Sequence, residues 1–355
     1  MRKACFLILL AFCACRQQQP ERLRPIIDSH VHLFPSPETA ERAERIFKMA
    51  GVERFCTKSA GAYPSKRFWA TVEMQREFGN RMTYFVNLDW EGVSEPGWSE
   101  RECRKLEKAA ENGARGVKIF KNLGLGVRDA EGKLLAVDDP RLDPIMEKAA
   151  ELDLIVAIHT SDPKAFFHPP TPDNERYLEL LFAPGWSFWG EDFPGKEELL
   201  AARNRLIARH PRTKFLGIHL ANNPEDLDAV DRWLEQYPNL WVDISARVPE
   251  IGRHPAEKVR QFFIKHQERI LFGSDLVINP DGLQLGSLSV WPQDENDAVK
   301  FYRRHREYFE TDRRQIEHPT PIQGDWKIDA INLPEEVLEK LYRKNALHLI
   351  WNEHE

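Results

Sequence analysis

Two histidines, two residues apart, end the first apolar run of the chain at residues 26–32. Side chains alternate between the two faces of a β-strand, so Asp28, His30 and His32 would share one face. Two imidazoles at one strand end can bind the same metal ion. The same spacing can serve packing, so a metal site requires further ligands at the ends of other strands.

Further polar side chains end other predicted strands, and they are Lys118, His159, His219 and Asp275. In a parallel barrel the carboxyl ends of the strands meet at one face, where the loops form a pocket. Imidazole and carboxylate groups gathered there can bind a divalent metal and transfer protons. One strand-end histidine is usually a packed core residue, but so many on separate strands favour a metal-dependent active site.

The elements that would position these side chains alternate along the chain. Short β-branched runs predict strands at residues 26–32, 52–57, 82–88, 114–120, 154–159, 214–219, 240–245 and 270–275. The stretches between and after them predict helices, among them residues 37–49, 65–78, 99–112, 140–151, 224–237, 255–267, 294–309 and 334–349. This alternation predicts the α/β class and, with eight strands, a (β/α)8 TIM barrel.

Two segments exceed ordinary loop length and predict long insertions after strands five and eight. Residues 161–195 are rich in aromatic side chains, and residues 276–333 contain a predicted helix that could be the eighth of the barrel. The first insertion emerges beside His159. It is therefore predicted either to form a wall or lid with an apolar surface for substrate, or to form a small local core.

The composition limits the classes of partner. The 355 residues carry a net charge of −6 and 42% hydrophobic residues, and no run of basic side chains occurs. These values argue against nucleic-acid binding and leave a small-molecule substrate as the expected partner, while a homo-oligomer stays possible. No linker or repeat divides the chain, so residues 26–355 are predicted to form one barrel domain.

The first fifteen residues have a different character. Arg2 and Lys3 precede an apolar block at residues 4–14, which predicts an export signal over residues 1–15. Its ending resembles a bacterial lipoprotein signal, in which cleavage precedes a cysteine that carries lipid, here Cys15. Plain secretion is the alternative. We expect an exported protein, either a membrane-anchored lipoprotein with a tether at residues 16–25 or a periplasmic or secreted one, with membrane contact only through the lipid anchor.

The strand-end motifs together resemble the amidohydrolase superfamily, specifically its amidohydrolase-related branch (amidohydrolase 2), which includes aminocarboxymuconate-semialdehyde and resorcylate decarboxylases and pyrone-dicarboxylate lactonases. The resemblance covers about residues 26–350 and depends on motifs at residues 28–32, 116–118, 138–144, 159–160, 219, 242–245 and 272–275. It implies a barrel of the metal-dependent hydrolase type. Two residues depart from the pattern, because Ala221 stands where many relatives have glycine and Ser274 replaces a common threonine.

The resemblance implies one divalent metal ion held by His30, His32, His159 and Asp275, with zinc expected and manganese or iron as alternatives. It also implies that His219 stands beside the metal and polarises or protonates the reacting group. Such an ion would lower the pKa of a bound water toward neutrality. Asp275 could take the proton of that water and deliver it to the leaving group, so Asp275 and His219 are expected to be catalytic.

Three charged residues nearby have more than one interpretation. Asp28 is expected to accept a hydrogen bond from a ligand imidazole, or to be a buried carboxylate paired with Lys118 or an arginine. Lys118 could be carbamylated and bridge a second metal ion, meet a substrate carboxylate, or pair with Asp28 or Asp243. A second metal is expected only if Lys118 is carbamylated. Arg247 could bind a substrate carboxylate or lie in solvent.

The residues together with the resemblance predict a metal-dependent hydrolase in which water attacks an ester, lactone or amide carbonyl of a small, carboxylate-bearing organic substrate. The alternative in the same site is a carboxy-lyase, which would decarboxylate an unsaturated or aromatic acid without oxidation. A third interpretation is a binding protein that has lost turnover. None of the expected ligands or acid–base residues is missing from the sequence, which argues against loss of turnover.

Overall fold

The computed structural model describes residues 23–190 and 192–353 of the chain. The predicted leader, Cys15 and most of the predicted tether lie outside these residues. Within the described part, no helix has both the length and the apolar character needed to cross a membrane.

A large sheet forms the centre of the described molecule, with strands in the order β10-β9-β1-β2-β3-β4-β5-β6-β7-β8. Only β10 pairs antiparallel to its neighbour in this sheet; the pairs from β9 to β8 are parallel. The strands are β1 (Ile26–Leu33), β2 (Val52–Thr57), β3 (Met82–Asn87), β4 (Gly116–Ile119), β5 (Ile155–Ile158), β6 (Lys214–Gly217), β7 (Leu240–Asp243), β8 (Ile270–Leu271), β9 (Leu276–Asn279) and β10 (Gly282–Leu285).

The sheet closes through the short link between β8 and β9. β8 pairs with β7, β9 pairs with β1, and only residues 272–275 separate the two strands. Two backbone hydrogen bonds join this link to β1, from Ser29 N to Phe272 O at 3.0 Å and from Asp275 N to His30 O at 2.8 Å. β8 and β9 therefore act together as the eighth barrel strand, and the predicted (β/α)8 architecture is confirmed.

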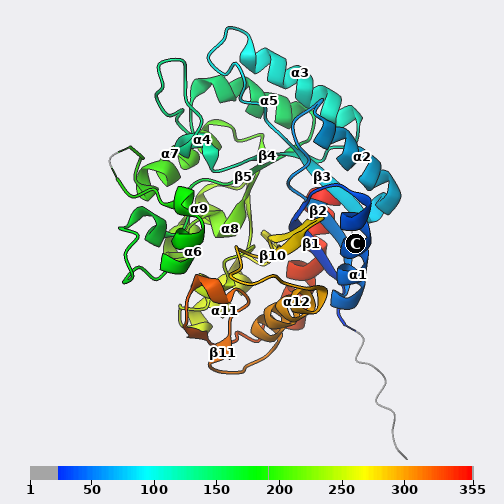
Figure 1. Ribbon diagram of the computed structural model, residues 1–355, viewed down its shortest axis with the longest axis vertical. Coiled ribbons are helices and arrows are strands. Elements are labelled where there is room, and N and C mark those ends of the chain that lie inside the picture. Colours follow the sequence, from blue (N-terminus) through cyan, green and yellow to red (C-terminus); the bar gives the residue numbers. More distant parts are fainter. Residues whose placement is uncertain (1–22, 191, 354–355) are drawn as a thin grey trace, which may run out of the picture.

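Helices lie around the outside of these strands (Figure 1). The longer ones are α1 (Pro37–Ala50), α2 (Lys66–Phe78), α3 (Trp98–Glu111), α5 (Asp143–Glu151), α7 (Lys196–Arg209), α9 (Leu227–Gln236), α11 (Ala256–Lys265) and α12 (Glu295–Glu310). Each buries an apolar stripe, as α1 does with Ala43, Ile46 and Phe47. α12 comes from the insertion after strand eight and packs against α1, so it occupies the place of the eighth outer helix.

The C-terminal segment closes the amino-terminal end of the barrel. It follows α13 (Glu335–Glu339) with helical turns at Lys340–Lys344 and Leu347–Trp351. Inward-facing side chains of the strands, including Ile27, Phe85 and Ile155, form one buried cluster with Leu347 and Ile350. Because apolar side chains fill this end, polar chemistry is left to the opposite end, where the strands finish.

Six strands end one to four residues earlier than the sequence predicts, and two of these differences position candidate site residues. The predicted strand 214–219 ends at Gly217, because His219 has a left-handed backbone with φ of 57°. The predicted strand 270–275 ends as β8 at Leu271, and Asp275 has φ of 64°. A left-handed residue turns the chain away from the extended path, so neither side chain continues the alternation of its strand. The hairpin of β9 and β10 lies where no strand was predicted.

Candidate active site

The carboxyl ends of the strands surround a cavity of about 200 Å³. Residues from the predicted site line much of it, namely His32, Lys118, His159, His219, Arg247 and Asp275. His30 is fully buried beside this wall, and its ring centroid lies 5.1 Å from that of His32 and 5.2 Å from that of His219. The barrel therefore gathers residues from six separate strand ends, those of β1, β4, β5, β6, β7 and β8, around one small space.

Asp275 faces both histidines of β1 across the seam of the barrel. His30 Nε2 lies 3.2 Å from His32 Nε2, and Asp275 Oδ1 lies 3.5 Å from the first nitrogen and 3.1 Å from the second. Burial opposes ionisation of Asp275, but the hydrogen bond with His32 and the nearby His30 lower its pKa to about 2. At neutral pH one carboxylate oxygen thus faces two imidazole nitrogens.

Asp243, at the end of β7, sets the orientation of His30. Its Oδ2 accepts a hydrogen bond from His30 Nδ1 at 2.9 Å. An ionised carboxylate can only accept, so the proton of the neutral ring is on Nδ1 and Nε2 keeps its lone pair. Burial lowers the pKa of His30 well below 6.5, so the ring is neutral at pH 7. His30 therefore presents a bare Nε2, the form of imidazole that binds a metal.

His219 belongs to α8 (Ile218–Ala221), which is a left-handed turn and not a regular helix. Its backbone N–H donates to Asp243 Oδ1 at 2.9 Å, and its Nδ1 lies 2.8 Å from the carbonyl oxygen of Ser245. A carbonyl only accepts, so Nδ1 again carries the proton. Burial lowers the pKa of His219 well below 6.5. Its free Nε2 can bind a metal or accept a proton, and it can donate only after it has accepted one.

His159 directly follows β5 and lies against His219, with 4.6 Å between the ring centroids. Its Nε2 lies 3.4 Å from Asp162 Oδ1 without hydrogen-bond geometry, and this buried nitrogen has no hydrogen-bond partner among the described residues. Burial lowers the pKa of His159 to about 4. A buried polar nitrogen without a partner is unfavourable, so the ring is a candidate for contact with a ligand.

These contacts fit a divalent metal ion. One ligand atom each from His30, His219 and Asp275 lie within 4.8 Å of one another. His32 Nε2 contacts two of these three groups. The carboxylate of Asp275 and the bare Nε2 atoms of His30 and His219 direct electron pairs toward one space, a repulsion that a cation bound between them would relieve. Mixed nitrogen and oxygen donors suit zinc, manganese or iron.

The geometry modifies the expected ligand set in one respect. His30, His32 and Asp275 are brought into direct contact, as expected. His219, which was expected only to stand beside the metal, lies as close to this group as a ligand would. His159 reaches the group through its contact with the His219 ring. The residues present could therefore hold one ion with either the fifth- or the sixth-strand histidine as an additional ligand.

Asp28 does not bind an imidazole, so the first expectation for this residue is wrong. Its Oδ1 accepts from the backbone N–H groups of His30 and Ser274, both at 3.1 Å, and its Oδ2 accepts from the Tyr302 hydroxyl at 2.7 Å. Among the described residues it has no ion pair with Lys118 or an arginine either. Asp28 lies one strand repeat before His30, so its side chain reaches the backbone beneath the site and not the rings.

Lys118 and Arg247 bring positive charge to the cavity. Within the described chain no hydrogen bond or ion pair reaches Lys118 Nζ, so the expected pairing with Asp28 or Asp243 is not found. Burial lowers the pKa of Lys118 to about 7. Arg247 is only 6% exposed, so it is not the solvated arginine of the alternative. Its guanidinium donates to the Ala246 carbonyl at 3.1 Å.

The insertion at residues 161–195 forms one wall of the cavity and also has a core of its own. Phe166 and Trp186 line the cavity, and Lys121 Nζ lies 4.5 Å from the centre of the Trp186 ring. The same lysine forms an ion pair with Asp162, which ties the insertion to the chain after β4. Phe188, behind this wall, packs against Phe167. One side of the insertion therefore forms a wall of the cavity, and the other side forms a small local core, so both expected roles are present.

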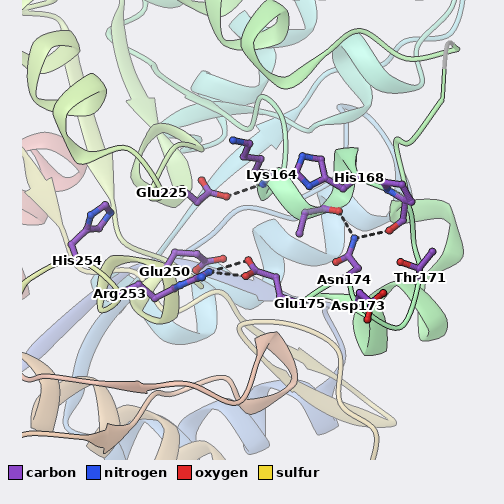
Figure 2. Close-up of a pocket in the computed structure, with 12 residues that line it drawn as sticks. Lys164, His168, Thr171, Asp173, Asn174, Glu175, Glu225, Glu250, Arg253 and His254 are labelled. Carbon is purple, nitrogen blue, oxygen red and sulfur yellow. Dashed lines mark hydrogen bonds and ion pairs between the residues drawn. The ribbon is translucent and has the colours of Figure 1, made fainter.

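A larger hollow of about 600 Å³ lies on another side of the insertion (Figure 2). Three of its four carboxylates have partners, and two of these are Glu175, which pairs with Arg253 at 2.8 Å, and Glu225, which accepts from the backbone N–H of Lys164 at 2.8 Å. Glu250 pairs with the buried Arg176. The paired charges do not form a set of converging ligands, so the smaller cavity is the candidate active site.

Sequence reasoning missed the roles of Asp243, Asp162 and Lys121. Asp243 ends β7, the neighbour of the strand that carries His219, so the rule that adjacent strand ends share a pocket could have found it. Asp162 and Lys121 lie beyond the ends of β5 and β4, inside connections whose path the sequence does not specify. Their pairing depends on how the insertion folds, and no local pattern signals it.

Comparisons with known proteins agree with this architecture. The amidohydrolase family model matches residues 91–350. Among solved structures, 2,6-dihydroxybenzoate decarboxylase from Rhizobium is 15% identical with a TM-score of 0.53, and the match covers 93% of this chain and 99% of that one. A Staphylococcus aureus protein assigned as an amidohydrolase is 13% identical with a TM-score of 0.54, over 92% and 100% of the two chains. At these identities the likeness concerns the fold. No curated protein sequence matches the chain.

Proposed function

Because the chain belongs to the amidohydrolase family of enzymes, we propose that it is a metal-dependent hydrolase that adds water to the ester, lactone or amide carbonyl of a small, carboxylate-bearing substrate. The observation that carries this proposal is the contact of the ionised Asp275 with His30 and His32, beside the bare Nε2 of His219, in one cavity. A divalent ion held by these residues would supply Lewis-acid chemistry, which acidifies water and polarises a carbonyl.

The protein's own groups would handle the protons. Asp275 is ionised and partly accessible from the cavity, with 20% of its side chain exposed, so it can accept a proton from the attacking water. After the carbonyl is attacked, the same carboxyl group can return this proton to the leaving oxygen or nitrogen. His219 is fixed by the Ser245 carbonyl with its Nε2 free, so it can orient or accept the proton of a second polar group on the substrate.

The cavity walls support a substrate that is both apolar and anionic. Lys118 and Arg247 lie on the wall without a carboxylate closer than 4.0 Å among the described residues. Phe120, Phe166 and Trp186 line the same space. A planar unsaturated or aromatic acid would place its carboxylate against the cations and its ring against the aromatic side chains. A volume of about 200 Å³ suits a substrate of few non-hydrogen atoms.

Decarboxylation of such an acid is the second candidate. The specific observation in its favour is Lys118, a buried amine with a pKa near 7 in a cavity that could bind a carboxylate directly. In that reaction the substrate has no scissile carbonyl bond, and a proton replaces the departing carbon dioxide. Asp275, which is ionised, would first take a proton from water or from a polar group of the substrate and then deliver it to the carbon.

A matched substrate panel separates the two reactions. Purified protein is freed of metal by a chelator, reloaded with zinc, manganese or iron, and tested on one aromatic diacid and on its mono-esters, mono-amides and a lactone that keeps one carboxylate. Hydrolysis predicts turnover of the esters, amides or lactones only with metal, and its loss in Asp275→Asn. Asp231→Asn, which changes a carboxylate of α9 on the outside of the barrel, is the control and should retain activity. Carbon dioxide release from the free acid would favour decarboxylation, and turnover independent of metal would refute both.

A further inference from the structure

His219 is held by an unusual backbone. His219, Leu220, Ala221 and Asn222 are four consecutive residues in the left-handed region, with φ of 57°, 53°, 52° and 54°. None of them is glycine, and a Cβ in this region lies too close to the following carbonyl oxygen. Such a conformation persists only where the surrounding structure enforces it. The turn that carries His219 must therefore be held by contacts from elsewhere in the chain.

Helix α7 supplies two such contacts from one face. Lys196 and Arg203 are seven residues apart, which places them on the same side of a helix two turns apart. Arg203 donates to the carbonyl oxygen of Ala221. Lys196 Nζ donates to the carbonyl oxygen of Asn222 at 2.8 Å and to that of Asp162, also at 2.8 Å. Two cations thus bind the carbonyl groups of the last two residues of the turn.

Arg203 is buried and, within the described chain, does not form a surface ion pair. The side chain is fully buried, lies 4.5 Å from the centre of the Trp233 ring, and otherwise bonds the side chain of its neighbour Asn204. No carboxylate pairs with it among the described residues. Burying a charge is unfavourable unless strong hydrogen bonds satisfy it. The Ala221 carbonyl oxygen is the main-chain acceptor of a hydrogen bond from this buried guanidinium, so α7 and the turn stabilise each other.

Lys196 also links the turn to the chain after β5. Its two carbonyl partners belong to Asn222 and Asp162, and Asp162 is the residue beside His159 Nε2. The Asn222 side chain adds a second link, because its Oδ1 accepts from Thr160 N at 2.9 Å and its Nδ2 donates to Ser161 O at 3.1 Å. The positions of the His159 and His219 segments are therefore coupled through α7.

We propose that Lys196 and Arg203 are positioning residues, which hold the left-handed turn of residues 219–222 and so keep His219 between His30 and His159. The inference rests on the proposed function only in treating His219 as a site residue. Neither cation lies within the candidate cavity. They act on the site through the backbone of the turn.

Hydrogen exchange in the metal-free full chain tests the proposal without an assay of activity. Arg203→Met and Lys196→Met are each compared with Arg205→Met, which removes a mostly exposed arginine of the same helix that pairs with Asp138 instead. We expect the amides of residues 219–223 to exchange about tenfold faster or more in the first two variants, the factor expected when one charge-assisted hydrogen bond is lost. The control should leave them unchanged. Exchange of the amides in β4 reports on global stability, and the exchange rates of residues 219–223 are normalised to it.

A rescue by glycine separates a positioning role from simple packing. Glycine adopts left-handed backbone without the steric clash, so Ala221→Gly should hold the turn with less help from α7. We expect the accelerated exchange in Arg203→Met to fall back to within about threefold of the parent when Ala221→Gly is added. Equal exchange in all three α7 variants, or no rescue, would overturn the proposal. If Arg203→Met does not fold, Lys196→Met with and without Ala221→Gly decides by the same criteria. A failed substrate panel would leave these results standing.

Discussion

Replacing Asp243 by asparagine should alter the protonation of His30 while changing the shape of the site little. The Asp243 carboxylate accepts from His30 Nδ1 with one oxygen and, with the other, from the backbone N–H of His219 at 2.9 Å, that of Ser245 at 3.2 Å and the Ser245 hydroxyl at 2.6 Å. The oxygen of asparagine can keep the second group of bonds. Its amide nitrogen then faces His30 Nδ1, where two donors meet.

The ring can avoid this clash by moving its proton from Nδ1 to Nε2. His30 Nε2 would then carry a hydrogen toward His32 and Asp275, and it could no longer offer a lone pair to a metal. Loss of a hydrogen-bond partner behind a metal-binding histidine typically lowers metal affinity by 10–100-fold, or about 1.4–2.8 kcal/mol. The cost to folding in the metal-free state should be smaller, about 1–2 kcal/mol, because the new Nε2–H can donate to Asp275.

Zinc affinity measured by competition with a chromophoric chelator checks this prediction, together with urea unfolding of the metal-free proteins. Asp231→Asn is the matched control, because Asp231 also accepts from a histidine, His266 Nε2 at 2.6 Å, on the outer helices. Zinc binding within twofold of the parent in Asp243→Asn would refute the proposed role of the Nδ1 proton. An equal loss of zinc affinity in the control would show that the effect of Asp243→Asn does not arise at the candidate site.

Two further predictions concern groups with shifted pKa. If Lys118 binds a substrate carboxylate, Lys118→Met should raise KM about tenfold or more for a carboxylate-bearing ester. The KM of a neutral analogue of that ester should not change. Equal losses in kcat for both esters, with lower metal content, would favour carbamylation instead. Burial lowers the pKa of His305 from 6.5 to about 4. The unfolded chain therefore takes up this proton first, and stability falls between pH 6.5 and 4 by about 3 kcal/mol. In urea unfolding across this pH range, metal-free His305→Leu should lack this share of the loss of stability. A change in unfolding free energy with pH identical to that of the parent would contradict the assignment.

Most of the fold was accessible from the sequence because its elements follow simple patterns; the hairpin of β9 and β10 is an exception. β5 consists of four buried apolar residues, as a strand covered on both faces must. α12 begins at the predicted place because Asp294 forms a capping box with Asp297, a signal readable from the chain. The candidate site residues follow from position, because strand ends converge in any such barrel, whereas their division into metal ligands and catalytic groups followed from the family resemblance.

The partners of the ligands were less accessible, since they depend on backbone conformations that no propensity favours. His219 and Asp275 both have left-handed backbone, whereas the sequence predicts extended strands through both residues. Asp28 was assigned to an imidazole because it shares a strand face with His30, yet its bonds are made to the backbone of the barrel seam. Side-chain alternation gives the face on which a residue lies, but it does not give the depth at which its polar atoms find partners.

The seam itself suggests why these features occur together. β1 and the link at residues 272–275 are joined by the Asp275 N–H to the His30 carbonyl at 2.8 Å. The single carboxylate of Asp28 binds the N–H groups of both His30 and Ser274. The same hydrogen bonds that close the barrel therefore fix the separation of the His30 ring from the Asp275 carboxylate. A metal bound to both side chains would strengthen the closure, so metal binding and the stability of this seam should be thermodynamically linked.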